Sequence, residues 1–154
     1  MKTTEINVDF ENSIGSWLGK TVKILEYHLQ ELFNKNDIDL TKEQMIVLKK
    51  LHDENGLSQN ELAFLTLRNK SSLTRLLSKM EKKNYIFRKQ SANDKRINRV
   101  FLTPKGKHIF TKTKPVIKEM INTAEQHITI EEKKQMIKTL KKIQSNFGSN
   151  SESL

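Results

Sequence analysis

Apolar residues recur every three or four positions along much of this chain, which is the spacing of a helix that buries one face. The first such stretch runs from about residue 8 to residue 33 and corresponds to some seven turns, a length of roughly 40 Å. Its apolar positions are Phe10, Ile14, Trp17, Leu18, Val22, Leu25, Leu29 and Leu32. A helix this long extends beyond what one small domain can cover, so we expect part of its apolar stripe to contact a second subunit.

Three capping boxes mark the starts of further helices, because a Ser or Thr three positions before a Gln or Glu satisfies free N–H groups of a first turn. They begin at Thr41, Ser58 and Thr129. Gly56 closes the helix that follows Thr41, at a position suited to the left-handed conformation. The helix after Ser58 is short, and Asn69 can cap the next one, which ends near residue 83. Two short helices joined by a tight turn are typical of a helix-turn-helix.

Two strand-like segments follow, residues 85–90 and 97–103, and the basic sequence SANDKR joins them. We expect a β-hairpin whose long tip exposes Asp94, Lys95 and Arg96. The alternative is a flexible surface hairpin, since nothing in the tip is rigid by composition. A hairpin directly after a helix-turn-helix predicts a winged helix.

Two further helices complete the predicted fold. Thr103 and Pro104 supply the cap and the first residue of the fifth helix, which Pro115 should kink. The core stripe that we expect for this helix contains Ile109, Thr113, Val116, Ile117, Met120, Ala124 and Ile128. The sixth helix follows the capping box at Thr129, and residues 148–154 are expected to be disordered. The fold class is therefore mainly α, an α+β winged helix with six helices and a two-stranded β wing.

The positive charge of the chain is concentrated in one segment. Residues 68–107 contain thirteen Lys or Arg and two acids, Glu81 and Asp94, for a net charge of +11, whereas the whole chain carries +10. Such a concentrated field on a helix-turn-helix and its hairpin is typical of a protein that binds nucleic acid. The alternative is a solvated Lys-rich surface.

The helix after Asn69 separates into two faces when its residues are placed at about 100° intervals. Leu73, Leu76, Leu77 and Met80 cluster on the face that we expect to be buried. No acid occurs among the polar residues of the opposite face and the first turn, and we predict that these residues contact DNA. They are Lys70, Ser71, Ser72, Thr74, Arg75, Ser78, Lys79 and Lys82. Small hydroxyls admit a helix deep into the major groove, Arg offers two donors to guanine, and the helix N-terminus attracts phosphate.

The hairpin tip completes the predicted DNA-binding surface. In a winged helix such a tip reaches the minor groove, where the negative potential of a narrow A·T tract attracts an Arg such as Arg96. We expect Asp94 to orient Arg96 through a charge-assisted hydrogen bond. Lys95 and Arg99 are further basic residues that we assign to this surface.

Several other chemistries are excluded or disfavoured by composition. The chain has no Cys, which excludes disulfides, thiol redox sensing and Cys-ligated zinc. Its longest apolar runs are four residues, and its N-terminus lacks an apolar signal segment, so we expect a cytoplasmic protein without a membrane span. The four His lack ligand spacing and no catalytic signature is present, so we expect neither an enzyme nor a cofactor. The alternative is a metal site that uses His52 or His108.

Residues 60–107 resemble the winged-helix segment of MarR-type transcriptional regulators. The most specific matches are the wing sequence from Asp94 to Arg96 and the sequence VFLTPKG at residues 100–106. The resemblance extends more loosely over residues 8–147, with a long first helix and two C-terminal helices. It implies an obligate homodimer that binds a palindromic operator in double-stranded DNA, usually as a repressor released by a small ligand.

Two turns depart from the family's pattern. Leu67-Arg68-Asn69 stands in place of the usual small, Gly-containing turn before the recognition helix, and Asn84 stands in place of the usual Gly after it. Because Asn tolerates the left-handed conformation, we expect the second turn to be preserved.

The resemblance also divides the chain by role. Residues 1–35 and 104–147 would form the dimerisation helices, and residues 36–103 the winged helix-turn-helix DNA-binding domain. The alternative function is a winged-helix protein-interaction module without specific DNA binding, which the Lys-rich recognition face disfavours because the centres of protein–protein interfaces are depleted in Lys.

In the family, ligands occupy a crevice between the dimerisation helices and the winged helix. A small aromatic or phenolic effector is therefore a candidate partner of this chain. Trp17, Tyr27 and His28 could line such a crevice, with an apolar wall and a few polar tips. The alternative is that these three residues belong to the core or to the dimer interface.

Overall fold

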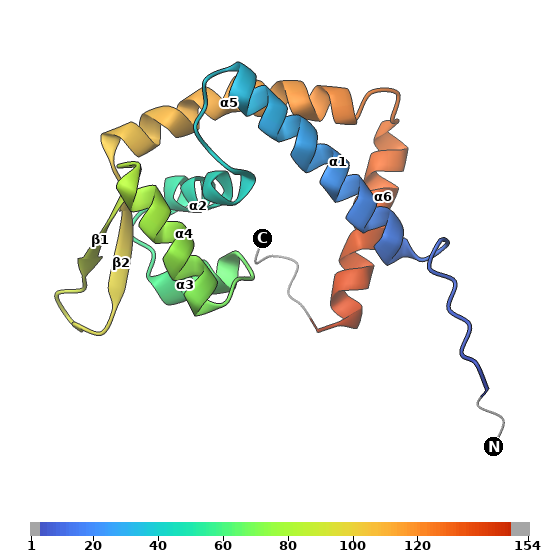
Figure 1. Ribbon diagram of the computed structural model, residues 1–154, viewed down its shortest axis with the longest axis horizontal. Coiled ribbons are helices and arrows are strands. Elements are labelled where there is room, and N and C mark those ends of the chain that lie inside the picture. The colour runs from blue at the N-terminus through green and yellow to red at the C-terminus, as the bar shows by residue number, and fades with distance from the viewer. Residues whose placement is uncertain (1–3, 149–154) are drawn as a thin grey trace.

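The computed structural model describes residues 4–148, which contain six helices and one two-stranded sheet (Figure 1). The elements are α1 (Ile14–Lys35), α2 (Lys42–Asp53), α3 (Gln59–Leu65), α4 (Lys70–Lys82), β1 (Ile86–Gln90), β2 (Asn98–Leu102), α5 (Pro104–Ala124) and α6 (Ile130–Asn146). The predicted mainly α winged-helix fold is confirmed. Apart from Gly148, the tail expected to be disordered lies outside the described residues.

The helix starts follow the predicted caps. Thr41, Ser58 and Thr129 each form a complete capping box, and the Asn69 side chain accepts a hydrogen bond from the N–H of Ser72 at 2.8 Å. The first helix, however, begins six residues later than the prediction of residue 8, because the Ser13 side chain caps it at Ile14. The apolar spacing therefore continued into a segment that is not helical.

The core belongs mainly to the winged helix. The buried face of α4 consists, as predicted, of Leu73, Leu76, Leu77 and Met80. These side chains lie in one cluster with buried residues of α2, α3, the hairpin and the first half of α5. β1 and β2 pair in antiparallel register from Ile86 opposite Leu102 to Gln90 opposite Asn98. The hairpin is thereby anchored at its base and projects its tip away from the core.

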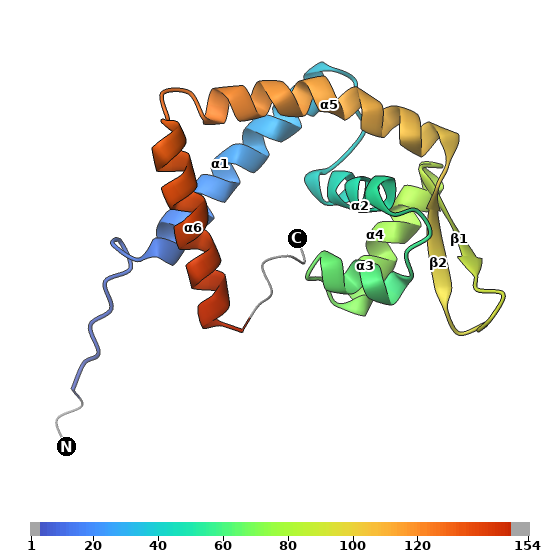
Figure 2. The same cartoon turned by 180° about the vertical axis from the view of Figure 1, so that it is seen from behind.

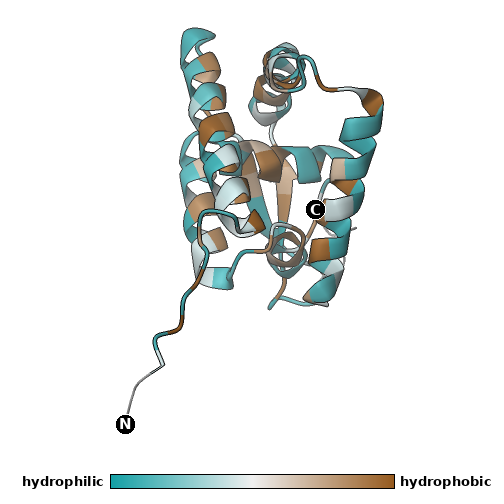
Figure 3. Cartoon of the chain, turned by 90° about the vertical axis from the view of Figure 1, so that its right-hand side faces the viewer, coloured by the Kyte–Doolittle hydropathy of each residue, from teal (hydrophilic) through white to brown (hydrophobic). Residues whose placement is uncertain are grey.

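The remaining helices extend away from this core. Figures 1 and 2 show α1, the second half of α5 and α6 on the side opposite the hairpin. Only Phe33 of α1 and no residue of α6 is buried among the described residues. Hydrophobic residues are interspersed with polar ones along the helices (Figure 3), and among the exposed ones are Trp17, Ile24, Met136 and Ile137. A large apolar surface is therefore left uncovered by residues 4–148 of the same chain.

The core stripe of α5 is correct only in its first half. Ile109, Thr113 and Val116 are buried, whereas Ala124 is exposed at the last position of α5. Ile128 lies beyond the end of the helix and is exposed as well. The physical reason is that α5 extends beyond the winged helix. Its second half faces α1 across cavities and is not packed into the core. Pro115 lies within a single helix, which continues on both sides of it.

Candidate nucleic-acid interface

The exposed face of α4 carries cations that no acid neutralises. Lys70, Arg75, Lys79 and Lys82 are exposed, and none of them forms an ion pair with another residue between 4 and 148. Ser71 and Thr74 are exposed beside them, and the Thr74 hydroxyl donates to the carbonyl of Lys70 at 2.8 Å. This face therefore offers several donors and an uncompensated positive charge to a ligand.

Two predicted contact residues lie at the edge of this face and are already engaged. Ser72 is half-buried, and its hydroxyl accepts from Nη2 of Arg68 at 2.7 Å. Ser78 is also half-buried, and its hydroxyl accepts from Nη2 of Arg88 at 3.3 Å. Their roles as DNA contacts stay predictions. Each hydroxyl would have to bind DNA while it also accepts a hydrogen bond from its Arg partner.

The one acid of α4 ties the helix to the hairpin. Both Nε and Nη2 of Arg88 donate to Oε2 of Glu81, at 3.1 and 2.6 Å, and the N–H of Arg88 donates to Oε1 at 3.3 Å. These hydrogen bonds to Arg88 lower the pKa of Glu81. Charge counting alone treated Arg88 as part of the basic surface, whereas the structure pairs it with Glu81.

The hairpin tip has the predicted arrangement of Asp94 and Arg96. The Asp94 carboxylate accepts from the backbone N–H of Arg96 at 3.0 Å and from its Nε and Nη2 at 3.2 Å each. The same hydrogen bonds lower the pKa of Asp94. The Arg96 side chain is 90% exposed, and Lys95 beside it is exposed as well. A fixed but solvent-facing guanidinium at the end of a hairpin suits insertion into a narrow groove.

Arg99 differs from the other predicted contact residues in its surroundings. It is half-buried, and its Nη1 donates to the carbonyl of Gly56 at 3.1 Å. The adjacent strand residue Val100 exchanges backbone hydrogen bonds with Gly56 and Leu57. Arg99 therefore fastens β2 to the loop before α3, and its contact with DNA remains a prediction.

The two turns that flank α4 are both left-handed. Asn84 has φ 61°, as expected for the residue in place of Gly. Leu67, in the turn between α3 and α4, has φ 53° and is 66% exposed. A left-handed backbone at a residue other than Gly, Asn or Asp costs on the order of 1 kcal/mol. The turn therefore keeps its left-handed geometry at Leu67, although Gly would adopt that geometry at lower cost.

The predicted effector residues do not converge on one cavity. Trp17 is 60% exposed, with Nε1 donating to the carbonyl of Glu11 at 2.8 Å, and Tyr27 is also exposed. His28 lines a cavity of about 830 Å³ between α1 and α5, close to Glu31. Neither Trp17 nor Tyr27 lines that cavity.

A second cavity lies where α2 of the winged helix faces α5. Its volume is about 790 Å³. The apolar part of its lining includes Met45, Phe110 and Ile117, and the charged part includes Lys49 and Lys114. Asp53 also lines this cavity and pairs with Lys49. Unlike the surroundings of Trp17, the cavity combines an apolar wall with charged groups that can orient a small ligand.

His52, one of the two His of the alternative metal site, has one aromatic and one acidic neighbour. His52 packs its ring against Phe110 at 4.9 Å between centroids, and its Nδ1 lies 3.8 Å from Asp53. No group of three or more His, Cys, Asp or Glu between residues 4 and 148 is placed to hold a metal ion. Within the same residues, no helix combines the length and the apolar character needed to cross a membrane.

The fold and the basic face of α4 define a winged helix-turn-helix protein of the DNA-binding class. Residues 40–97 match the model of the MarR family. The HTH-type transcriptional regulator SarZ of Staphylococcus epidermidis is 30% identical over 139 residues, which are 86% of this chain and 93% of SarZ. The chain belongs to the MarR family and is a sequence-specific DNA-binding transcriptional regulator.

Solved structures agree with this assignment. The structure of the Staphylococcus aureus MepR–DNA complex superposes with a TM-score of 0.80 at 25% identity and covers 87% of this chain and 98% of MepR. Bordetella bronchiseptica BpsR, a protein whose DNA binding is regulated by 6-hydroxynicotinic acid, superposes with a TM-score of 0.80 at 18% identity, covering 90% of this chain and 97% of BpsR. Both share the winged-helix fold described above.

Proposed function

We propose that two copies of this chain bind a palindromic operator and act as a repressor. A small ligand would lower the affinity of this dimer for DNA. In this arrangement α4 of each copy enters the major groove and the hairpin tip reaches the adjacent minor groove. The observation that carries the proposal is the face of α4, where four exposed cations have no acidic partner within the described residues. The chain would then act in the cytoplasm, and as a regulator rather than an enzyme.

The dimer is supported by the uncovered apolar surface. Residues 1–35 and 104–147 would form the dimerisation helices, and residues 36–103 the DNA-binding domain. In this scheme the exposed apolar side chains of α1 and α6, such as Trp17 and Met136, are covered by the second copy. Removal of such a surface from water favours association.

The DNA contacts divide into two kinds. Arg75, in the middle of the exposed face, has a guanidinium suited to a guanine edge and would determine sequence preference. Lys70, Lys79 and Lys82 would contact phosphates, which set affinity and its dependence on salt. Arg96 would contact the minor groove.

The effector would bind in the cavity between α2 and α5. Its apolar wall at Phe110 and Ile117 suits an aromatic ring. The ammonium groups of Lys114 and Lys118 suit a carboxylate or phenolate. The cavity joins a helix of the DNA-binding domain to a dimerisation helix, so a ligand there would change how the two parts are placed. BpsR, which responds to a hydroxylated aromatic acid, supports the chemical class.

Selection of bound duplexes from a random pool tests the proposal. Wild-type protein should enrich a palindrome, Arg75→Ala should relax preference at one position of each half-site, and Lys82→Ala should weaken all sequences evenly. The salt dependence of Lys82→Ala should be shallower by about one phosphate contact per chain. No enrichment by the wild type, together with salt-independent binding to random duplex, would favour the protein-interaction module instead.

A further inference from the structure

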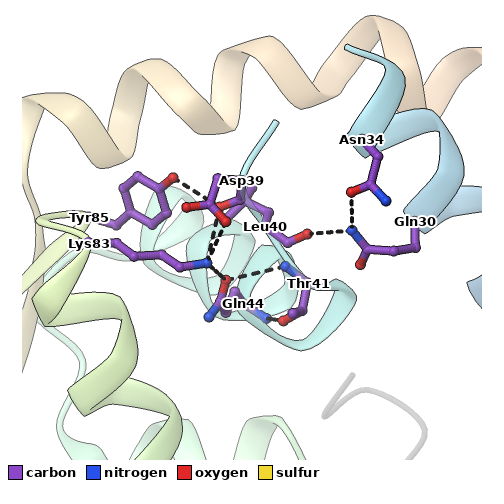
Figure 4. Close-up of polar contacts among 8 residues, drawn as sticks. All are labelled: Gln30, Asn34, Asp39, Leu40, Thr41, Gln44, Lys83 and Tyr85. Carbon is purple, nitrogen blue, oxygen red and sulfur yellow. Dashed lines mark hydrogen bonds and ion pairs between the residues drawn. The ribbon is translucent and has the colours of Figure 1, made fainter. Parts of the chain in front are cut away.

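A polar junction connects the end of α4 to the segment that joins α1 and α2 (Figure 4). Lys83, the C-cap of α4, donates from Nζ to Oδ1 of Asp39 at 2.9 Å, to the carbonyl of Asp39 at 3.3 Å and to Oε1 of Gln44 at 3.0 Å. Its side chain is only 27% exposed. Lys83 thus differs from its neighbour Lys82, because its charge is committed to oxygens of the protein.

Gln44 links this junction to the start of α2. It is buried, and its Oε1 accepts both from Lys83 and from the backbone N–H of Thr41 at 3.2 Å, within the capping box of α2. A buried amide oxygen with two donors has little freedom to move, because loss of either donor leaves a polar group unpaired away from water. The end of α4 is therefore held against the first turn of α2.

Tyr85 adds the start of the hairpin to the same junction. It is buried, and its hydroxyl donates to the carbonyl of Asp39 at 2.9 Å. Burial, and then the charge of Asp39, raise the pKa of Tyr85, so the hydroxyl keeps its proton at neutral pH. The Asp39 carbonyl consequently accepts from one residue at the end of α4 and from another beside β1.

The other side of the junction is attached to α1. Nε2 of Gln30 donates to the carbonyl of Leu40 at 3.3 Å, and Nζ of Lys42 lies 2.7 Å from Oε1 of Glu26 (Figure 4 shows the first of these contacts). A continuous series of polar contacts thus runs from the proposed dimerisation helix to the base of the proposed recognition helix.

We propose that Lys83 is a positioning residue that, through Asp39 and Gln44, fixes the angle between α4 and the dimerisation helices, and so sets which half-site spacing the dimer accepts. The inference rests on the proposed homodimeric operator binding. α4 has 13 residues and is about 20 Å long. A tilt of about 10° about its C-terminal end would therefore move its N-terminus by roughly 3.4 Å, which is the rise of one base pair.

The experiment measures affinity for the selected operator and for derivatives with the half-sites one base pair closer or farther apart. For the wild type we expect affinity to fall about tenfold when the spacing changes by one base pair in either direction, and we call this loss the spacing penalty. Lys83→Met keeps an unbranched side chain that lacks only the terminal ammonium, and so removes the charge. We expect it to bind the optimal spacing about fivefold more weakly and to reduce the spacing penalty to about threefold or less. Lys83→Arg, which restores a cation, should recover the steep profile.

Lys82→Met is the matched control, since it removes an exposed charge one residue away. It should weaken all spacings equally and make the salt dependence shallower, whereas Lys83→Met should leave the salt dependence unchanged. A shallower salt dependence for Lys83→Met would identify Lys83 as a phosphate contact and overturn the inference. An unchanged spacing profile in both Lys83→Met and Asp39→Ala would overturn it too. The Asp39 side chain is 76% exposed, so we expect Asp39→Ala to fold. Its spacing profile therefore tests the inference even if Lys83→Met unfolds.

Failure of the proposed function gives a different result. A wild type that binds with no optimum of spacing contradicts the homodimer on a palindrome, and the inference about Lys83 falls with it. A wild type with a clear optimum, and a loss of affinity with spacing that is equally steep in Lys83→Met and Asp39→Ala, contradicts only the inference.

Discussion

Gly106→Ala is the substitution whose effect the packing defines most sharply. Gly106 lies in the first turn of α5, where its N–H donates to Oγ1 of Thr103 at 2.9 Å. A Cβ at this position would lie 2.0 Å from the carbonyl oxygen of Tyr85. That carbonyl accepts from the N–H of Thr103 at 3.1 Å, so the obstacle is a backbone group that is itself held in place.

The magnitude follows from the shift that a methyl group would require. Ordinary contact begins at 3.4 Å, so α5 and the start of the hairpin would have to separate by about 1.4 Å. Such overpacking costs about 1–3 kcal/mol, while the higher helix propensity of Ala returns at most about 1 kcal/mol. We expect a net destabilisation of about 1–2 kcal/mol, which corresponds to a melting temperature lower by about 2–8 °C. Operator binding should also weaken, because the hairpin is displaced from α5.

Thermal unfolding followed by circular dichroism measures this effect at a fixed protein concentration, since dimerisation makes the melting temperature concentration-dependent. Lys107→Ala is the control, because Lys107 is exposed in the same turn and its loss should change stability by less than about 0.5 kcal/mol. A Gly106→Ala protein that melts at or above the wild-type temperature would refute the close approach of α5 to Tyr85.

Three further changes test other parts of the structure. Leu77→Ala, at a fully buried position of α4, should destabilise the protein by about 2–5 kcal/mol in urea unfolding without a change in the slope. The pairing with Arg88 lowers the pKa of Glu81 in the folded state, so its contribution to stability is present above the ordinary carboxyl range and is lost as pH falls below it. The urea midpoint should therefore fall less between pH 5 and about pH 3 in Glu81→Gln than in the wild type; equal falls would show that the pair contributes nothing. Asp94→Asn should free the Arg96 side chain and reduce preference for A·T-rich flanks in a binding titration, with an unchanged melting temperature.

Local signals in the sequence were sufficient for most of the fold. A capping box predicts where a helix begins, because its two hydrogen bonds join residues only three positions apart, as at Thr41 and Ser58. The buried face of α4 was predictable for the same reason, since helical angle depends on position alone. Apolar spacing alone does not locate a helix start. Phe10 has helical spacing and yet lies before the cap of α1 at Ser13, so the predicted start of α1 was too early.

Contacts between distant residues were not predictable in the same way. Ser72 and Ser78 share the exposed face by angle, but their Arg partners come from a turn and from β1. Gln44 was identified only as part of a capping box, and its burial under Lys83 depends on how α2 and α4 pack. A charge count cannot distinguish Lys82, which is free of acidic partners among the described residues, from Lys83, which is held by three oxygens.

The most direct test of the account is the salt dependence of binding to the selected operator, with the number of protein chains per duplex measured on the same complex. Three phosphate-contacting cations per chain, at positions 70, 79 and 82, give six in a dimer, and the logarithm of the binding constant should fall with the logarithm of salt concentration with a slope of roughly −5. We predict that slope, with two chains bound to each operator. A slope shallower than about −2, or a single chain on each duplex, would contradict it.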